Sequence, residues 1–148
     1  MKNIFILLAD DDKDDRFFFD KALGSISLPS DFVAVEDGEK LMSWLRKAAK
    51  LPDVLFLDIN MPRKNGAECL AEIKSDPVLK KIPVIMYSTS LHNDVADVLY
   101  QKGASYYIQK TDFTELPPLI EKALKMILEK RGAQPLRNEF ILQSEKLA

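Results

Sequence analysis

The chain has 148 residues and a net charge of -2, with 47% hydrophobic and 30% charged side chains. These values are ordinary for a soluble globular protein, and this length favours a single domain. The charge balance excludes a general attraction to nucleic acid or to anionic membranes, and no apolar segment is long enough to span a bilayer. Cys69 is the single cysteine, so an internal disulfide is excluded and a cytoplasmic location is expected.

Five apolar segments of strand character alternate with five segments of helical periodicity. The expected strands are 4–9, 32–35, 54–57, 83–87 and 105–109. The first four helices are expected to end near Gly24, Lys50, Asp76 and Gly103. The last helix is expected over 113–131, with Pro117 or Pro118 tolerated only in its first turn. Ser88 to Ser90 end the fourth strand and can cap the helix that follows.

This alternation predicts an α/β fold, an open five-stranded parallel sheet with helices on both faces. The usual strand order of such doubly wound folds is 2-1-3-4-5, and ligands bind beyond the carboxyl ends of strands one and three. Residues 1–131 are expected to form this domain. Residues 132–148 are expected to form a tail, too short for an output domain. Either the tail is loosely ordered, or Phe140 to Leu142 dock on the domain or on a second chain.

Polar residues follow the strands at the edge where ligands are expected. They are Asp10 and Asp11, Asp58, Ser88 and Lys110. A buried strand does not normally end in an unpaired carboxylate, because its desolvation is costly. Carboxylates that lie close together repel, and Mg²⁺, which prefers oxygen ligands, would relieve that repulsion.

These side chains suit phosphoryl transfer. Asp58 would be the nucleophile that forms an aspartyl phosphate. Lys110 and Mg²⁺ would neutralise the phosphoryl oxygens in the transition state, and Ser88 could donate to one of them. Asp12, Asp14 and Asp15 are better explained as residues that cap and favour the first helix. Register alone leaves open which two of the three consecutive aspartates 10–12 face the site.

Four motifs then occur in order along the chain. They are Leu-Ala-Asp-Asp-Asp, Asp-Ile-Asn-Met-Pro-x-x-x-Gly, Pro-Val-Ile-Met-Tyr-Ser and Gly-Ala-Ser-Tyr-Tyr-Ile-Gln-Lys. In content and spacing the chain resembles the response-regulator receiver domains of two-component signalling, the CheY-like family. Lys-Ser-Asp-Pro-x-Leu-Lys-x-Ile-Pro-Val resembles most the stand-alone regulators paired with phytochrome-type kinases.

The resemblance implies that Asp58 accepts phosphate from a sensor histidine kinase or a histidine phosphotransfer protein. It implies Mg²⁺ ligands from Asp10, Asp11 and Asp58, with the backbone carbonyl of Asn60 as a further one. Ser88 and Lys110 match the family's conserved hydroxyl and lysine, and Tyr107 its switch aromatic.

Such a domain catalyses only its own phosphorylation and slow dephosphorylation and is not otherwise an enzyme. The expected output is a change in protein-protein contacts with a downstream target. A homodimer through the face of the fourth helix, fifth strand and fifth helix is plausible by resemblance. Neither nucleic acid nor membrane is an expected partner.

Two positions depart from the family pattern. Thr111 replaces the proline that usually follows the lysine through a cis peptide, and one extra residue precedes Phe113. A cis bond before threonine would cost about 3 kcal/mol, so a trans bond and a differently shaped loop are expected. Thr89 replaces a usually smaller residue, and the hypothesis is that it limits access of hydrolytic water and prolongs phosphorylation.

Three other classes of protein fit these residues less well. A haloacid-dehalogenase-like phosphatase also uses an aspartyl nucleophile, but it needs a second aspartate two residues later, where this chain has Asn60. A flavodoxin-like flavoprotein needs a phosphate-binding loop after the first strand, where five aspartates would repel the phosphate. A degenerate receiver that only binds partners would not be expected to keep all the residues named above.

Overall fold

The fold is described by a computed structural model at residues 2–112, 114–130 and 133–143. One sheet contains six parallel strands in the order β2-β1-β3-β4-β5-β6. The strands are β1 (Ile4–Ala9), β2 (Ser30–Val35), β3 (Val54–Asp58), β4 (Val84–Ser88), β5 (Tyr106–Gln109) and β6 (Ile141–Leu142). The predicted order of the first five strands is confirmed. The prediction of a five-stranded sheet is wrong, because residues near the C-terminus pair with β5 and add a sixth strand.

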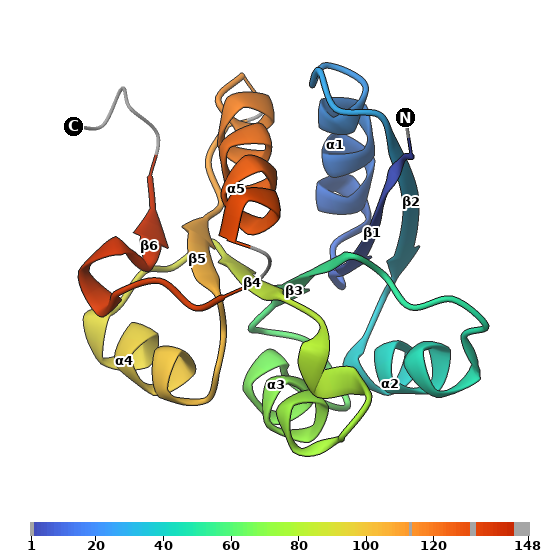
Figure 1. The fold of residues 1–148 in the computed structure, drawn as a ribbon, viewed down its shortest axis with the longest axis vertical. Helices are drawn as coiled ribbons and strands as arrows, with labels where there is room; N and C mark the ends of the chain where they lie inside the picture. The colour runs from blue at the N-terminus through green and yellow to red at the C-terminus, as the bar shows by residue number, and fades with distance from the viewer. Residues whose placement is uncertain (1, 113, 131–132, 144–148) are drawn as a thin grey trace.

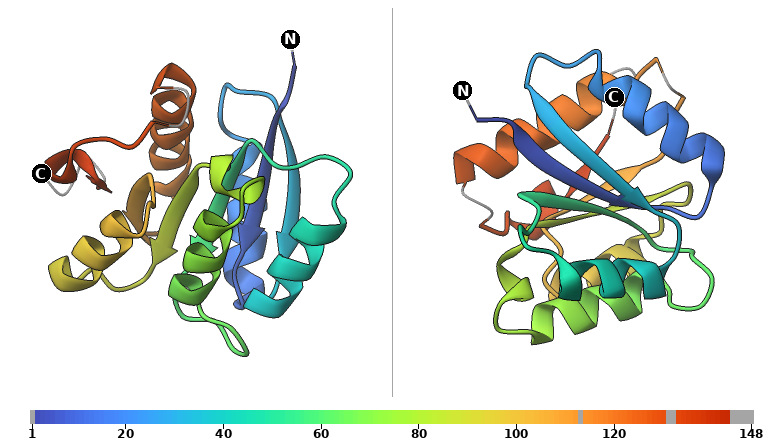
Figure 2. Two further views of the ribbon diagram at one scale, coloured as in Figure 1. Left: turned by 60° about the horizontal axis from the view of Figure 1, so that its bottom comes forward. Right: turned by 90° about the vertical axis from the view of Figure 1, so that its right-hand side faces the viewer.

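Helices cover both faces of the sheet, as predicted. They are α1 (Lys13–Leu23), α2 (Gly38–Lys47), α3 (Gly66–Ser75), α4 (Asn93–Gln101) and α5 (Leu116–Lys130). Figure 1 shows α1 and α5 on one side of the sheet and α2, α3 and α4 on the other, and Figure 2 shows the same layers from two further directions. The predicted ends of the last helix, 113 and 131, lie outside the described residues. Pro117 and Pro118 fall in the first turn of α5, as expected.

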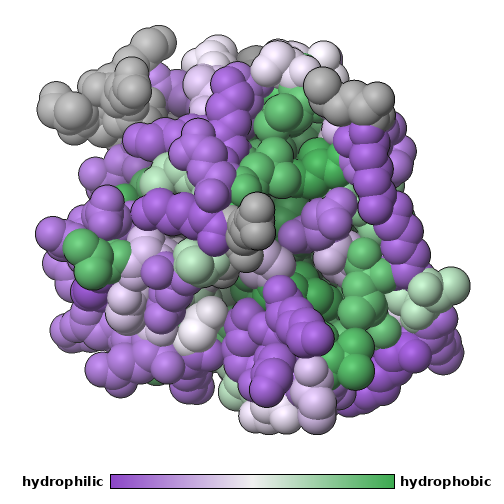
Figure 3. Space-filling model, viewed as in Figure 1, coloured by the Kyte–Doolittle hydropathy of each residue, from purple (hydrophilic) through white to green (hydrophobic). Residues whose placement is uncertain are grey.

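The core consists of two apolar layers, one on each side of the sheet. Strands β1, β3 and β4 are buried along their whole length, because helices cover both of their faces. One layer packs against α1 and α5 and includes Phe19, Phe56 and Leu124. The other packs against α2, α3 and α4. In Figure 3 apolar side chains are visible between α1 and α5, whose outer surfaces are mostly hydrophilic.

Local capping confirms one expectation and corrects another. Asp12 is the N-cap of α1, and its side chain accepts hydrogen bonds from the backbone N–H groups of Asp14 and Asp15. Ser88 to Ser90, at the end of β4, do not cap α4. That helix begins at Asn93 with His92 as its N-cap, so the residues between β4 and α4 form a longer loop than expected.

The C-terminal segment, residues 133–143, lies against α4 and β5. Phe140 and Leu142 are buried, and the backbone N–H of Tyr107 donates to the carbonyl of Phe140 at 3.0 Å. Figure 1 shows this segment, in red, crossing from the end of α5 to the edge of β5. Of the two alternatives for the tail, the structure therefore shows docking on the domain, as far as Gln143. Residues 144–148 lie outside the described part of the chain.

Within the described ranges, the longest and most apolar helices fall short of what a bilayer crossing requires. The same ranges contain no cis peptide bond. The bond between Lys110 and Thr111 is therefore trans, as expected. The extra residue inferred before Phe113 concerns a position outside the described residues.

Candidate functional site

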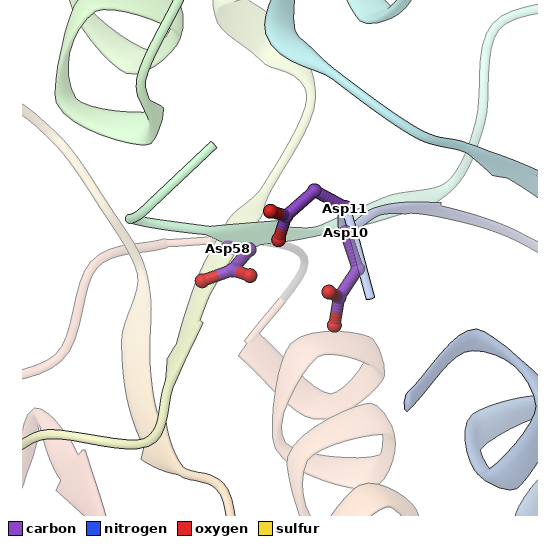
Figure 4. A group of neighbouring side chains, drawn as sticks. All are labelled: Asp10, Asp11 and Asp58. Atoms are coloured by element: carbon purple, nitrogen blue, oxygen red, sulfur yellow. The ribbon is translucent and has the colours of Figure 1, made fainter. Parts of the chain in front are cut away.

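Three carboxylates meet at the carboxyl ends of β1 and β3. Asp10 and Asp11 directly follow β1, and Asp58 is the last residue of β3. The two strands are neighbours in the sheet, so their ends lie side by side. One carboxylate oxygen from each residue lies within 4.8 Å of the other two. Figure 4 shows the three side chains gathered at this edge, so the predicted grouping of Asp10, Asp11 and Asp58 is what the structure contains.

The site holds buried negative charge. Asp10 is fully buried and Asp58 is 5% exposed, whereas Asp11 is open to solvent. Asp10 Oδ1 accepts a hydrogen bond from the backbone N–H of Asp12, and buried Oδ2 lies 2.9 Å from the Lys110 ammonium. Burial raises the pKa of Asp58 to about 6, against the attraction of Lys110, and the charge of Asp10 adds to the rise.

Lys110 supplies the balancing positive charge. Its Nζ lies 2.8 Å from Asp15 Oδ2, 2.9 Å from Asp10 Oδ2 and 3.2 Å from Asp58 Oδ2. It also lies 5.1 Å from the centre of the Tyr87 ring. Burial acts to lower the pKa of Lys110, but its hydrogen bonds and the surrounding carboxylates raise that pKa above its usual value. The ammonium group therefore stays charged at physiological pH.

The turn after β3 approaches the backbone of Asp58 closely. The N–H of Gly66 donates to the carbonyl of Ile59 at 2.8 Å. A Cβ atom at position 66 would lie 2.2 Å from the carbonyl oxygen of Asp58, so only glycine fits there. The N–H of Asn60 donates to Asp58 Oδ1 at 3.3 Å. The close packing of this turn holds the backbone of Asp58 in place, and the Asn60 N–H contacts its carboxylate.

Ser88 ends β4, the strand beside β3, and Tyr107 lies on β5, the next strand; Ser90 contacts both of them. Ser88 is buried, and its Oγ accepts a hydrogen bond from the N–H of Ser90 at 3.4 Å. The hydroxyl of Tyr107 donates to the carbonyl of Ser90 at 2.7 Å, and the ring is only 1% exposed. Tyr107 thus already points inward.

The structure brings together most of the residues singled out in the sequence. Asp10, Asp58 and Lys110 are in direct contact, and Asp11 lies within the same group. In the described residues, the hydrogen bonds of the Ser88 hydroxyl are to Ser90, in the loop after β4, and none is to Asp58. Asp15 was missed. The sequence indicates that Asp15 lies at the start of the first helix, and the structure adds that its carboxylate contacts Lys110.

The carboxylate cluster has the character of a hard-cation site. It offers oxygen ligands only, and two of its three carboxylates, Asp10 and Asp58, are buried. Mg²⁺ and Mn²⁺ favour such ligands. Because the exposed Asp11 completes the cluster on the solvent side, the residues present fit a divalent cation that keeps some of its waters.

Comparison with known proteins agrees with this geometry. The family model of the response regulator receiver domain matches residues 6–132. Response regulator Rcp1 of Synechocystis is 32% identical over 111 residues, which cover 72% of this chain and 76% of Rcp1. NtrC of Salmonella typhimurium, a DNA-binding transcriptional regulator, is 33% identical over 88% of this chain but only 27% of its own length.

Solved structures give the same result. The phosphorylated cyanobacterial phytochrome response regulator RcpA superposes with a TM-score of 0.79 and 36% identity, covering 87% of this chain and 96% of RcpA. The Mn²⁺-bound form of Rcp1 superposes with a TM-score of 0.75 and 28% identity, covering 89% and 99%. The chain belongs to the response regulator receiver domain family, and the proteins that it resembles include a phytochrome response regulator.

Proposed function

We propose that Asp58 accepts a phosphoryl group from the phosphohistidine of a sensor histidine kinase or a histidine phosphotransfer protein. The observation that carries the proposal is the Asp58 carboxylate, held 3.2 Å from the Lys110 ammonium beside two further aspartates. A carboxylate oxygen of Asp58 attacks phosphorus, the P–N bond to the histidine breaks, and the imidazole retains the bonding electron pair and takes up a proton. The product is an aspartyl phosphate.

Asp10, Asp11 and Asp58 would hold Mg²⁺, with the backbone carbonyl of Asn60 as a further ligand. The cation would offset the charge of the carboxylates and of the phosphoryl oxygens. Lys110 Nζ donates to a phosphoryl oxygen from the place where it now contacts Asp58. Ser88 Oγ donates to another oxygen after giving up its contact with Ser90.

The phosphoryl group acts as a switch in this proposal, and self-phosphorylation and slow self-dephosphorylation are the only reactions catalysed. Movement of Ser88 shifts the loop that carries Ser90 and so favours the inward position of Tyr107. That change remodels the surface of α4, β5 and α5 for a downstream protein or a second copy of this chain. We further propose that residues 1–131 form the receiver domain, that residues 132–148 act as a tail, and that signalling takes place in the cytoplasm.

The test uses the full chain, acetyl phosphate as donor and Mg²⁺. The protein should take up one phosphoryl group when both are present, and addition of EDTA before the donor should prevent uptake. The adduct should survive acid and be lost in base, as an acyl phosphate is. The variant Asp58→Asn should take up none. Uptake that is independent of Mg²⁺, or undiminished in that variant, would overturn the proposal.

A further inference from the structure

The contacts of Lys110 point to a role for Asp15. Asp15 is the third residue of α1, and its Oδ2 makes the shortest of the three ion pairs with Lys110, at 2.8 Å. Asp10 and Asp58 belong to the carboxylate cluster, whereas Asp15 does not. If a cation and a phosphoryl group enter, the charges of Asp10 and Asp58 are shared with them. Asp15 then remains as the carboxylate whose contact is with Lys110.

We propose that Asp15 is a positioning residue that holds the Lys110 ammonium beside Asp58. This rests on the proposed function of Asp58. Lysine has a long side chain with several rotatable bonds, so a point charge at its end is poorly fixed without a partner. The Lys110 side chain is 9% exposed and that of Asp15 is 32% exposed. A hydrogen bond between charged groups at a largely buried site is strong enough to orient the ammonium.

The test compares Asp15→Asn with Asp14→Asn in the full chain. Both remove one negative charge from the first turn of α1, but no described contact joins Asp14 to Lys110. The maximal rate of phosphorylation by acetyl phosphate should fall about tenfold in Asp15→Asn, as expected for the loss of one charge-assisted hydrogen bond. It should stay unchanged in Asp14→Asn, and Asp15→Glu should recover part of the loss.

A second readout separates positioning from general damage. The dissociation constant for Mg²⁺ should be the same in Asp15→Asn as in Asp14→Asn, because Asp15 lies outside the carboxylate cluster. Equal phosphorylation rates in the two variants would overturn the role of Asp15. A fall of the Mg²⁺ affinity of Asp15→Asn as large as the fall of its phosphorylation rate would overturn it too. A wild-type chain that takes up no phosphoryl group would instead overturn the proposed function, and the role of Asp15 with it.

A different set of contacts links the C-terminal segment to Tyr107. Phe140 is fully buried between Tyr100 and Tyr107, with ring centres 5.2 and 6.3 Å away. The carbonyl of Phe140 accepts a hydrogen bond from the Tyr107 N–H. Phe140 thus packs against the ring of Tyr107 while the Tyr107 hydroxyl is held inward by Ser90.

Polar contacts along the segment hold it in the same place. The Tyr100 hydroxyl donates to the carbonyl of Pro135 at 2.6 Å. The side-chain amide of Gln134 donates to the carbonyl of Tyr100 at 2.7 Å and to that of Ala104 at 2.8 Å. Arg137 pairs with Asp97 of α4 at 2.7 Å. The segment is therefore fastened to α4 before it reaches β5.

From these contacts we infer that the C-terminal segment stabilises the inward position of Tyr107. An inward ring leaves space at the edge of β5, and Phe140 fills that space. If phosphorylation of Asp58 also favours the inward ring, as proposed above, then docking of the segment and phosphorylation support each other. Such coupling is reciprocal, so each event should strengthen the other by the same factor.

The test uses Phe140→Ala, with Leu136→Ala as the matched control, since Leu136 lies in the same segment but is 68% exposed. Beryllium fluoride with Mg²⁺ serves as a stable phosphoryl analogue. Its affinity should fall by at least about fivefold in Phe140→Ala, a usual size for coupling between sites. The control should bind as the wild type does.

Hydrogen exchange gives the reciprocal measurement. In the wild type, beryllium fluoride should slow exchange of the Tyr107 amide, which donates to Phe140. Binding of the analogue with no slowing of this amide, or with equal affinity in Phe140→Ala, would overturn the inference about the segment. Failure of the wild type both to bind the analogue and to accept phosphate would overturn the proposed function as well.

Discussion

The carboxylate site and the C-terminal segment are both connected to β5, because Lys110 directly follows that strand and β6 pairs with it, but they are stabilised in opposite ways. Three carboxylates surround Lys110, two of them are buried, and the pKa of Asp58 is raised to about 6. The segment instead buries Phe140 and pairs its polar groups with α4 and β5. The first region is arranged to gain from a cation or a phosphoryl group. The C-terminal segment is stabilised by contacts that are already formed, so it can hold Tyr107 in its inward position without a ligand.

The largest effect on stability is expected from Lys110→Met. The substitution removes the partner of three carboxylates, two of them buried. Loss of one member of a buried ion pair costs about 3 to 5 kcal/mol. Urea unfolding at neutral pH without divalent cations should show a loss of this size, and Mg²⁺ should restore part of it. A loss below about 1 kcal/mol, the range of exposed pairs, would contradict the balance described for this site.

A smaller effect is expected in the second region. Phe140→Ala should lower the free energy of unfolding by about 3 kcal/mol, the lower end of the range for a buried phenylalanine. Leu136→Ala should change it by no more than about 0.5 kcal/mol because that side chain is exposed. Urea unfolding of both variants measures the difference. Equal stability of the two would show that the segment is not held by Phe140.

The strands and helices could be predicted from the sequence, because each depends on a pattern local to its own segment. The apolar run of β3 ending at Asp58 is one such pattern. The strand order and the carboxylate cluster then followed from the usual topology of folds with this alternation. Strand β6 could not be predicted. It has two residues, Ile141 and Leu142, and too few positions for a recognisable period. The contact of Asp15 with Lys110 spans 95 residues and depends on how α1 packs.

The loop after β4 also could not be predicted. A hydroxyl residue before a helix is a usual N-cap, so Ser88 to Ser90 were reasonable candidates. In the structure Ser88 and Ser90 contact each other and Ser90 accepts from Tyr107, so tertiary contacts determine where these groups point. The carboxylate cluster contains Asp10 and Asp11, as the resemblance implied, whereas Asp12 caps α1.

Asp58→Asn removes one negative charge from the site and is expected to raise stability, whereas Lys110→Met is expected to lower it. The folded-state pKa of Asp58 is raised from 3.8 to about 6, so folding disfavours its charged form. Wild-type stability should therefore fall as pH rises from about 4 to about 6, whereas the asparagine variant loses nothing there. Above this range, without divalent cations, the variant should be more stable by about 3 kcal/mol.

Thermal unfolding as a function of pH gives this difference directly. The two proteins should converge below the ordinary carboxyl pKa of 3.8. Saturating Mg²⁺ should reduce the gap at neutral pH, because the cation would pair with the wild-type carboxylate. A variant that is less stable than the wild type at neutral pH in the absence of cations would contradict the raised pKa.

The smallest effect is expected at Thr89, which is exposed next to Ser88. If its side chain limits the approach of water to the aspartyl phosphate, Thr89→Ala should shorten the lifetime of the adduct without changing stability. The decay of phosphorylated protein after removal of acetyl phosphate measures this lifetime. An unchanged or slower decay would rule out this role for Thr89.

The central claim is that the charged pair of Asp58 and Lys110 is a phosphoryl-accepting site, and the most direct measurement is to locate the modified residue. Protein treated with acetyl phosphate and Mg²⁺ is reduced with borohydride, which converts an aspartyl phosphate to homoserine, and then digested and sequenced by mass spectrometry. We expect homoserine at position 58 and at no other aspartate, including Asp10 and Asp11. Conversion at another aspartate with position 58 intact would contradict the account.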